Sequence, residues 1–179
     1  MDRETDGARL ASHTTDLLAL VTEPKADPRP TVAAYAGVGN EPPTRQLLDA
    51  LATQGARVIL PVVTEHPALE HPALDWAPYD GWDALATVRW GLLEPTTTRL
   101  GPQAVETAAL VVVPALAVDR RGNRLGRGKG FYDRALASVP KHRRVAVVYA
   151  GEILDNVPHE PHDEPVGWAL TPEGVTKLG

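Results

Sequence analysis

Short continuous apolar runs alternate along the chain with segments whose apolar residues recur at helical spacing. The runs occupy residues 31–36, 57–63, 109–114 and 144–149, and a shorter extended segment is expected at 74–76. Continuous runs of this length are typical of strands buried on both faces of a sheet. Their alternation with helices predicts an α/β fold, a single three-layer domain over residues 1–179 with a largely parallel central sheet flanked by helices.

One helix is expected before the first of these strands and two are expected between strands. One covers residues 9–21, and another covers residues 40–55 with an apolar face of three leucines, Leu47, Leu48 and Leu51. In the second helix Asn40 is a suitable N-cap, while Glu41 and Pro42 suit the first turn. The third helix is expected at residues 131–138, and the pattern at residues 83–90 also permits a short helix.

Composition excludes several classes of protein. The 179 residues include no cysteine, so neither disulfides nor thiolate chemistry are expected. The apolar runs are too short to cross a bilayer, and a cytoplasmic protein that binds no membrane is expected. A net charge of −5 argues against a nucleic-acid binder, which needs a broad basic surface.

Positive charge is concentrated in one glycine-rich turn, Arg-Leu-Gly-Arg-Gly-Lys-Gly-Phe-Tyr-Asp-Arg at residues 124–134. Residues 119–134 contain six cations and two acids, a net charge of +4. Glycines at 126, 128 and 130 permit positive φ angles and close backbone approach, so N–H groups can converge on an anion, and Lys129 can add a point charge. The turn therefore predicts a phosphate site, although a basic surface turn that caps a helix is an equally simple interpretation.

The turn does not match the two commonest nucleotide motifs. A Walker loop needs glycine and a hydroxyl residue where this chain has Asn123 and Gly130. The dinucleotide fingerprint needs two residues between its last two glycines, and here there is one. Because ligands of open α/β sheets bind at the carboxyl ends of strands, Glu41, which follows the first strand, and the glycine turn are expected to meet in one crevice.

The string GNRLGRGKGFYDR at residues 122–134, after the apolar LVVVPALAVD at 110–119, resembles the signature of the 5-formyltetrahydrofolate cyclo-ligase family. Further segments match that family in order and approximate spacing over residues 31–171. They are Tyr35 with Glu41-Pro42-Pro43-Thr44, Leu60-Pro61, Glu94-Pro95, Val157-Pro158 and His162-Asp163. The resemblance also favours extended or irregular structure, rather than a helix, at residues 83–90.

The resemblance implies an ATP- and Mg²⁺-dependent cyclisation of a small-molecule substrate, 5-formyltetrahydrofolate, by a monomeric ligase. The formyl oxygen attacks the γ-phosphate of ATP, and the adjacent folate nitrogen then closes the ring and expels phosphate. The products are 5,10-methenyltetrahydrofolate, ADP and phosphate.

Carried over by position, the resemblance also assigns residues to roles. The catalytic residues that it implies are Lys129, Arg127 and Tyr132. The nucleotide site consists of Arg124, Leu125, Gly126, Arg127, Gly128, Lys129, Gly130, Phe131, Tyr132 and Arg134. The folate site consists of Ala36, Glu41, Trp90, Arg127, Gly128, Lys129, Gly130 and Phe131, with Glu41 suited to the amino-pyrimidine edge of the pterin. Asp133 and Asp163 resemble the magnesium site.

Simpler interpretations remain for most of these residues. Glu41 and Asp133 at helix starts are commonly dipole features, and Asp163 in a loop is commonly solvated. The histidines at 66, 71, 159 and 162 lack a soft third ligand and are more typical of surface residues. Two other functions stay open: a non-catalytic folate- or nucleotide-binding homologue, and a sugar-phosphate or acyl-group enzyme of similar fold.

One feature departs from the family pattern. Family members usually begin with a basic helix that reaches the ATP phosphates, whereas this chain begins Met-Asp-Arg-Glu-Thr-Asp and has only Arg3 and Arg9 as cations there. The basic helix is therefore expected to be absent. A start placed too late, weak ATP binding or a different role would each account for that.

Overall fold

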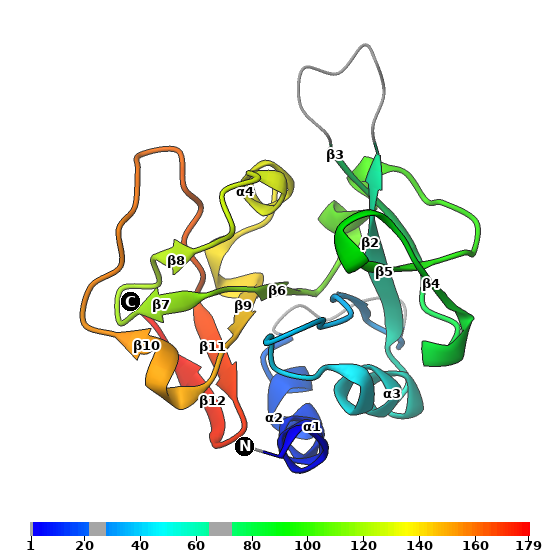
Figure 1. Cartoon of the computed structure of the whole chain (residues 1–179), viewed down its shortest axis with the longest axis horizontal. Coiled ribbons are helices and arrows are strands. Elements are labelled where there is room, and N and C mark those ends of the chain that lie inside the picture. The colour runs from blue at the N-terminus through cyan, green and yellow to red at the C-terminus, as the bar shows by residue number, and fades with distance from the viewer. Residues whose placement is uncertain (1, 22–27, 65–72) are drawn as a thin grey trace.

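A computed structural model describes residues 2–21, 28–64 and 73–179. Its centre is a seven-stranded sheet in the order β12-β11-β9-β6-β1-β2-β3 (Figure 1). The strands are β1 (Thr31–Ala33), β2 (Arg57–Thr64), β3 (Ala73–Pro78), β6 (Leu110–Pro114), β9 (Arg144–Val147), β11 (Trp168–Thr171) and β12 (Gly174–Lys177). The five inner strands are parallel, and the two edge strands β3 and β12 are antiparallel to their neighbours. The predicted α/β fold with a largely parallel sheet is confirmed.

Alternate residues of the inner strands pack into two separate hydrophobic cores, one on each face of the sheet. Val32 and Val112 face one core, which is covered by α1 (Arg3–Ser12), α2 (Thr14–Leu18) and α3 (Arg45–Thr53). Val111 and Val113 face the other, which is covered by α4 (Phe131–Leu136) and the 3-10 helix η3 (Pro102–Thr107). Strands that are apolar on both faces thus produce the three layers. In the described part of the chain no helix is long and apolar enough to cross a membrane.

Two smaller sheets flank the central one. A three-stranded sheet joins β10 (Ile153–Leu154), β7 (Ala117–Asp119) and β8 (Arg124–Leu125), and a hairpin joins β4 (Leu85–Thr87) to β5 (Leu93–Pro95). The remaining short 3-10 helices are η1 (Trp82–Ala84), η2 (Arg89–Gly91), η4 (Lys141–Arg143) and η5 (Ala150–Glu152). Residues 83–90 therefore contain the strand β4 between parts of two short 3-10 helices, so the single short helix permitted by the pattern is wrong, and the extended structure that the family resemblance indicated is present only in part.

The bounds predicted for the N-terminal helix are wrong. Helix α1 begins at Arg3, and the Asp2 side chain before it accepts the N–H of Glu4. The helical conformation is interrupted at His13, before α2 begins. The His13 Nε2 atom lies 3.0 Å from the carbonyl oxygen of Pro172, so a tertiary contact fixes the break. The segment is helical, but its first turn carries the acids Glu4 and Asp6.

The start predicted for the next helix is also wrong. Helix α3 begins at Arg45, and Asn40, Glu41 and Pro42 lie in the loop before it. The Thr44 hydroxyl donates to the carbonyl of Tyr35 at 2.7 Å and accepts the N–H of Gly37 at 2.8 Å. These bonds close residues 35–44 into a loop at the end of β1, so Glu41 is free of the helix.

Two more differences concern the second half of the chain. Helix α4 ends at Leu136, before the predicted 138, and the hairpins β7–β8 and β11–β12 were not predicted. The β7–β8 hairpin separates β6 from the glycine turn. The fully buried Asp119 holds its turn by accepting N–H groups of Arg121, Asn123 and Val157. Burial would by itself raise the pKa of Asp119, but the hydrogen bonds led by Asn123 outweigh it and hold that pKa below its ordinary value.

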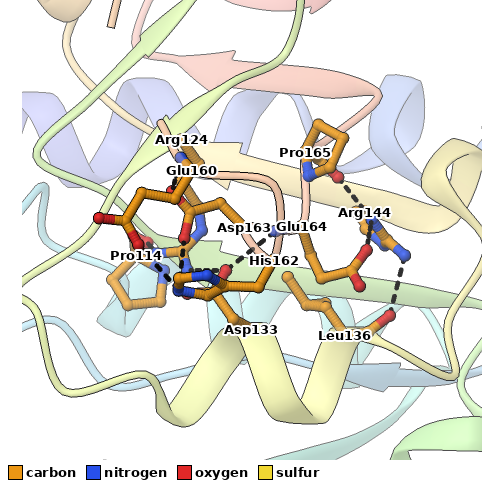
Figure 2. Close-up of polar contacts among 10 residues, drawn as sticks. All are labelled: Pro114, Arg124, Asp133, Leu136, Arg144, Glu160, His162, Asp163, Glu164 and Pro165. Atoms are coloured by element: carbon orange, nitrogen blue, oxygen red, sulfur yellow. Dashed lines mark hydrogen bonds and ion pairs between the residues drawn. The ribbon is translucent and has the colours of Figure 1, made fainter. Parts of the chain in front are cut away.

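The buried side chain of Arg144 fastens the loop before β11 to the end of α4 (Figure 2). Its guanidinium donates to the carbonyls of Leu136 at 2.9 Å, Val139 at 2.8 Å and Pro165 at 2.7 Å. The Nη1 atom also lies 3.0 Å from Oε2 of Glu164. One cation therefore satisfies three carbonyls that would otherwise be buried without donors.

We expect Arg144→Met to lower the free energy of unfolding by about 3–5 kcal/mol, because it leaves those carbonyls and Glu164 without a partner. Chemical denaturation followed by circular dichroism measures the loss. The control is Arg120→Met, which removes a side chain that is 78% exposed and lies 3.6 Å from Asp155. The control should remain within about 0.5 kcal/mol of the wild type. Equal losses in the two variants would contradict the role given to Arg144.

Candidate active site

A cavity of about 300 Å³ opens at the carboxyl ends of the parallel strands. The segment after β1 contributes Tyr35, Ala36 and Glu41, the end of β6 contributes Pro114, and the glycine turn contributes residues 124–133. All the site residues expected from the sequence line this cavity except Arg134. Glu41 and the glycine turn thus share one crevice, as the strand topology predicted.

Positive φ angles shape the glycine turn. Gly128 has φ 82° and Gly130 has φ 71°, values that residues with a Cβ atom rarely adopt. The chain consequently reverses between β8 and α4 within five residues, and Arg127 and Lys129 project from the turn as exposed side chains. The sequence prediction of a glycine turn between a strand and a helix is correct, although α4 is a short helix.

Arg124 belongs to the framework of the site. Its side chain is 6% exposed, and its Nη1 atom donates to the Pro114 carbonyl at 3.1 Å. Its Nη2 atom lies 3.4 Å from Oδ1 of Asp133, and its guanidinium lies 5.8 Å from the Tyr132 ring centroid. Burial raises the pKa of Tyr132, which keeps that phenol protonated. Arg124 therefore offers little surface to a ligand and orients Asp133.

Arg127 and Glu41 form an ion pair across the cavity. Arg127 Nη2 lies 3.3 Å from Oε1 of Glu41, and Oε2 of Glu41 accepts the N–H of Val38 at 2.8 Å. Arg3 of α1 donates to the Glu41 carbonyl at 2.9 Å. Both carboxylate oxygens of Glu41 are thus engaged within the chain, and the interpretation of Glu41 as a helix-dipole residue is wrong.

Trp90 reaches the glycine turn from the opposite side. Lys129 Nζ lies 3.7 Å from the Trp90 ring centroid, and the Phe131 ring lies 6.5 Å away at an interplanar angle of 40°. Trp90 is 45% exposed and has φ 62°, a left-handed conformation that is unfavourable for a bulky residue. Cation–π contacts to Lys129 and to Arg89, at 4.3 Å, help to offset this strain.

The two aspartates expected to bind metal both line the cavity, and the loop at residues 158–165 brings Asp163 toward α4 (Figure 2). Oδ1 of Asp133 accepts the N–H of Glu164 at 3.1 Å, and Oδ2 of Asp163 accepts the N–H of Glu160 at 2.7 Å. His162 Nε2 lies 3.5 Å from Asp163 and is 71% exposed.

Among the described residues, no three His, Cys, Asp or Glu side chains form a metal-binding group. Two carboxylates without soft ligands fit Mg²⁺, which retains waters and phosphate oxygens, better than they fit Zn²⁺. His162 contacts acids at the surface, as the simpler interpretation expected, and His66 and His71 lie outside the described residues.

Sequence reasoning gave no role to Glu94. This residue of β5 lines the cavity, and its Oε2 atom accepts the N–H of Val63 at 2.7 Å. Burial raises the pKa of Glu94, and this effect exceeds the opposing influence of the Val63 hydrogen bond and the charge of Arg99. The available signal was the Glu94-Pro95 pair, which the family resemblance included without assigning it a role.

The family model of the 5-formyltetrahydrofolate cyclo-ligase family matches residues 6–172. A 5-formyltetrahydrofolate cyclo-ligase of Mycolicibacterium smegmatis is 45% identical over 150 residues, which cover 83% of this chain and 77% of that protein. The Escherichia coli K12 protein of the same name is 29% identical over 158 residues, 87% of this chain and 85% of that one. The solved structure of Aquifex aeolicus 5,10-methenyltetrahydrofolate synthetase matches with a TM-score of 0.68 and 26% identity, covering 99% of this chain and 85% of the other. The chain belongs to the 5-formyltetrahydrofolate cyclo-ligase family.

Proposed function

We propose that this protein converts 5-formyltetrahydrofolate into 5,10-methenyltetrahydrofolate at the expense of ATP and with the help of Mg²⁺. The observation that carries the proposal is the shared cavity. It combines a cationic glycine turn, two aspartates and an apolar wall with aromatic side chains. Such a cavity suits a reaction in which a phosphoryl group is transferred to a substrate with a flat ring.

The chemistry requires activation of a poor electrophile. The formyl oxygen forms a bond to the γ-phosphorus while the bond from that phosphorus to the ADP oxygen breaks. The neighbouring nitrogen N10 then bonds to the formyl carbon, phosphate departs with the former formyl oxygen, and N10 loses its proton. The protein contributes positioning and charge neutralisation, because phosphoryl transfer needs little covalent help.

The glycine turn supplies the nucleotide side of this site. Arg127 and Lys129 are exposed cations that line the cavity, and Lys129 contacts the Trp90 ring. With the nucleotide bound, Lys129 would exchange that contact for one with the transferred phosphoryl group. A compact ammonium suits this role because it places a point charge close to the γ-phosphate oxygens. Tyr132 lines the same cavity in its neutral form and presents a hydroxyl.

Asp133 and Asp163 would hold Mg²⁺. When bound with the nucleotide, the ion would neutralise charge on the phosphate groups. Arg124 and the Glu164 N–H fix the position of the Asp133 carboxylate, and the Glu160 N–H fixes that of Asp163. These bonds leave each carboxylate an oxygen free of backbone hydrogen bonds for the cation.

The folate side consists of the segment after β1 and the aromatic pair across the cavity. Ala36 and Glu41 line one wall, and Trp90 and Phe131 approach each other at the other. Aromatic side chains can stack face to face on a flat pterin or pack against it edge to face. Glu41 also positions the Arg127 side chain through their ion pair.

An absorbance assay for 5,10-methenyltetrahydrofolate tests the proposal. The protein is mixed with 5-formyltetrahydrofolate with and without ATP, and with and without Mg²⁺. We expect product only when both are present, together with one ADP for each product molecule. Binding of the folate without conversion would instead indicate a non-catalytic homologue.

Lys129→Ala should lower kcat about a hundredfold to a thousandfold, because the charge that develops on the transferred phosphoryl group loses its neutralising cation. Steady-state assays at saturating ATP and folate measure this change. Lys177→Ala is the matched control, since Lys177 is exposed on the edge strand β12 and does not line the cavity. A kcat for Lys129→Ala equal to that of the control would remove Lys129 from the mechanism.

Asp133→Asn should raise the Mg²⁺ concentration needed for half-maximal activity at least about tenfold, because an anionic oxygen ligand is lost. The amide oxygen retains an acceptor for Arg124 and for the Glu164 N–H, but the buried guanidinium loses its counter-charge. Thermal unfolding therefore checks that the variant is folded at the assay temperature. Activity is measured across a Mg²⁺ titration at fixed ATP. Asp155→Asn, which changes a 99% exposed acid, serves as the control. An unchanged Mg²⁺ requirement in Asp133→Asn would place the ion elsewhere.

A further inference from the structure

The exposed cations of the glycine turn that line the cavity contact residues of two other segments. Arg127 Nη2 lies 3.3 Å from Oε1 of Glu41, in the loop after β1. Lys129 Nζ lies 3.7 Å from the ring centroid of Trp90, in the loop between β4 and β5. Figure 1 shows α4, which follows the turn, on one side of the molecule and the β4–β5 hairpin on the other. These contacts therefore connect the phosphate-binding turn to the wall proposed for the folate.

The partners of the two cations are fixed by other bonds. Oε2 of Glu41 accepts the Val38 N–H at 2.8 Å, and the Glu41 N–H donates to the Val38 carbonyl at 3.1 Å. The loop that carries Trp90 is closed by a hydrogen bond of 2.8 Å from the Val88 N–H to the Leu92 carbonyl. Glu41 and Trp90 consequently stay on the cavity wall when a ligand displaces the cations.

The cations are the mobile members of these pairs. The Arg127 side chain is 50% exposed, and the Lys129 ammonium lies at the end of an exposed, flexible stem. An ion pair of a half-exposed side chain is weak, and so is a cation–π contact near solvent. A chain of phosphate groups offers several charge-assisted hydrogen bonds, which are stronger. A nucleotide triphosphate therefore competes successfully for both cations.

Displacement of the cations changes the surface that a flat ring can reach. Lys129 lies over the Trp90 ring, and Arg127 contacts Oε1 of Glu41. Arg89 also lies over the Trp90 ring, at 4.3 Å, but does not line the cavity, so Lys129 is the cation that a ligand there displaces. A folate that binds before the nucleotide has to displace both cations, whereas a folate that binds after it does not.

We propose that the phosphates of the bound nucleotide draw Arg127 and Lys129 away from the folate wall and thereby strengthen folate binding. Glu41 and Trp90 then act as positioning residues, which hold the two cations within reach of the phosphates until the nucleotide binds. Because the binding free energies of two ligands are linked, the folate strengthens nucleotide binding by the same factor. This inference rests on the proposed function.

The coupling is measured with Mg²⁺ and the β,γ-methylene analogue of ATP, which does not transfer its γ-phosphate. Isothermal titration calorimetry gives the Kd of 5-formyltetrahydrofolate with and without a saturating concentration of the analogue. A second ligand, 5-formyl-6-methyltetrahydropterin, has the ring but no carboxylate, so attraction between a carboxylate and the cations does not affect its Kd. The variants are Lys129→Ala and, as the matched control on β12, Lys177→Ala. Thermal unfolding checks that each variant is folded.

The wild type and Lys177→Ala should bind both folate ligands about tenfold more tightly when the ATP analogue is present, a typical size for coupling between two sites. Without the analogue, Lys129→Ala should bind the pterin ligand about threefold more tightly than the wild type does. This change is half of the coupling on a logarithmic scale, because one of the two cations is removed. A lysine that only helped to bind the ring would change the Kd in the opposite direction.

Tryptophan fluorescence tests the displacement of Lys129 without any folate. Sodium tripolyphosphate should change the fluorescence of the wild type, because the ammonium leaves the Trp90 ring. The same addition should give no such change in Lys129→Ala or in Trp90→Phe.

Three results would overturn the inference while leaving the proposed function standing. They are a wild-type Kd for 5-formyltetrahydrofolate that the ATP analogue does not lower, pterin binding by Lys129→Ala that is no tighter than that of the wild type, and a fluorescence change that persists in Trp90→Phe. A wild-type protein that binds no 5-formyltetrahydrofolate under either condition would overturn the proposed function and this inference together.

Discussion

The contact between the buried guanidinium of Arg124 and the carboxylate of Asp133 joins the separate parts of the chain that form the cavity. The same guanidinium donates to Pro114 at the end of β6, and the same carboxylate accepts the N–H of Glu164. A central strand, the glycine turn, α4 and the loop at residues 158–165 therefore meet at one ion pair. Transferring a charge from water into the protein interior costs free energy, and these additional hydrogen bonds offset part of that cost.

Parallel topology made part of this site predictable. Runs apolar on both faces indicated the inner strands, and ligands of such sheets bind where the strands end. That reasoning placed Glu41 and the glycine turn together although more than eighty residues separate them, and the structure joins them by the Glu41–Arg127 ion pair. Local helix signals failed at Glu41, because the Thr44 hydroxyl closes a loop with Tyr35 and Gly37, which no pattern of capping residues reveals.

The conformations of other parts of the site depend on contacts between distant segments, which the sequence does not reveal. The left-handed conformation of Trp90 is held by side chains of the glycine turn, and the orientation of Glu94 is held by a backbone group of β2. Arg144 looks like one more cation in a basic stretch, yet its side chain is buried and fastens two segments of the second half of the chain. Charge in the sequence does not distinguish a solvated cation from a buried one, because burial is a property of the packed structure.

The position, burial and ion pairs of each cation decide whether it is available to a phosphate group. Arg3 donates to the Glu41 carbonyl, Arg9 lies 3.4 Å from Glu173, and neither lines the cavity. Arg124 is buried against Asp133. Arg127 and Lys129 remain as exposed cations on the cavity, one held by a carboxylate and the other by an aromatic face. Both contacts exchange more readily than a buried ion pair, so the charge that a phosphoryl group needs is concentrated on the turn that can deliver it.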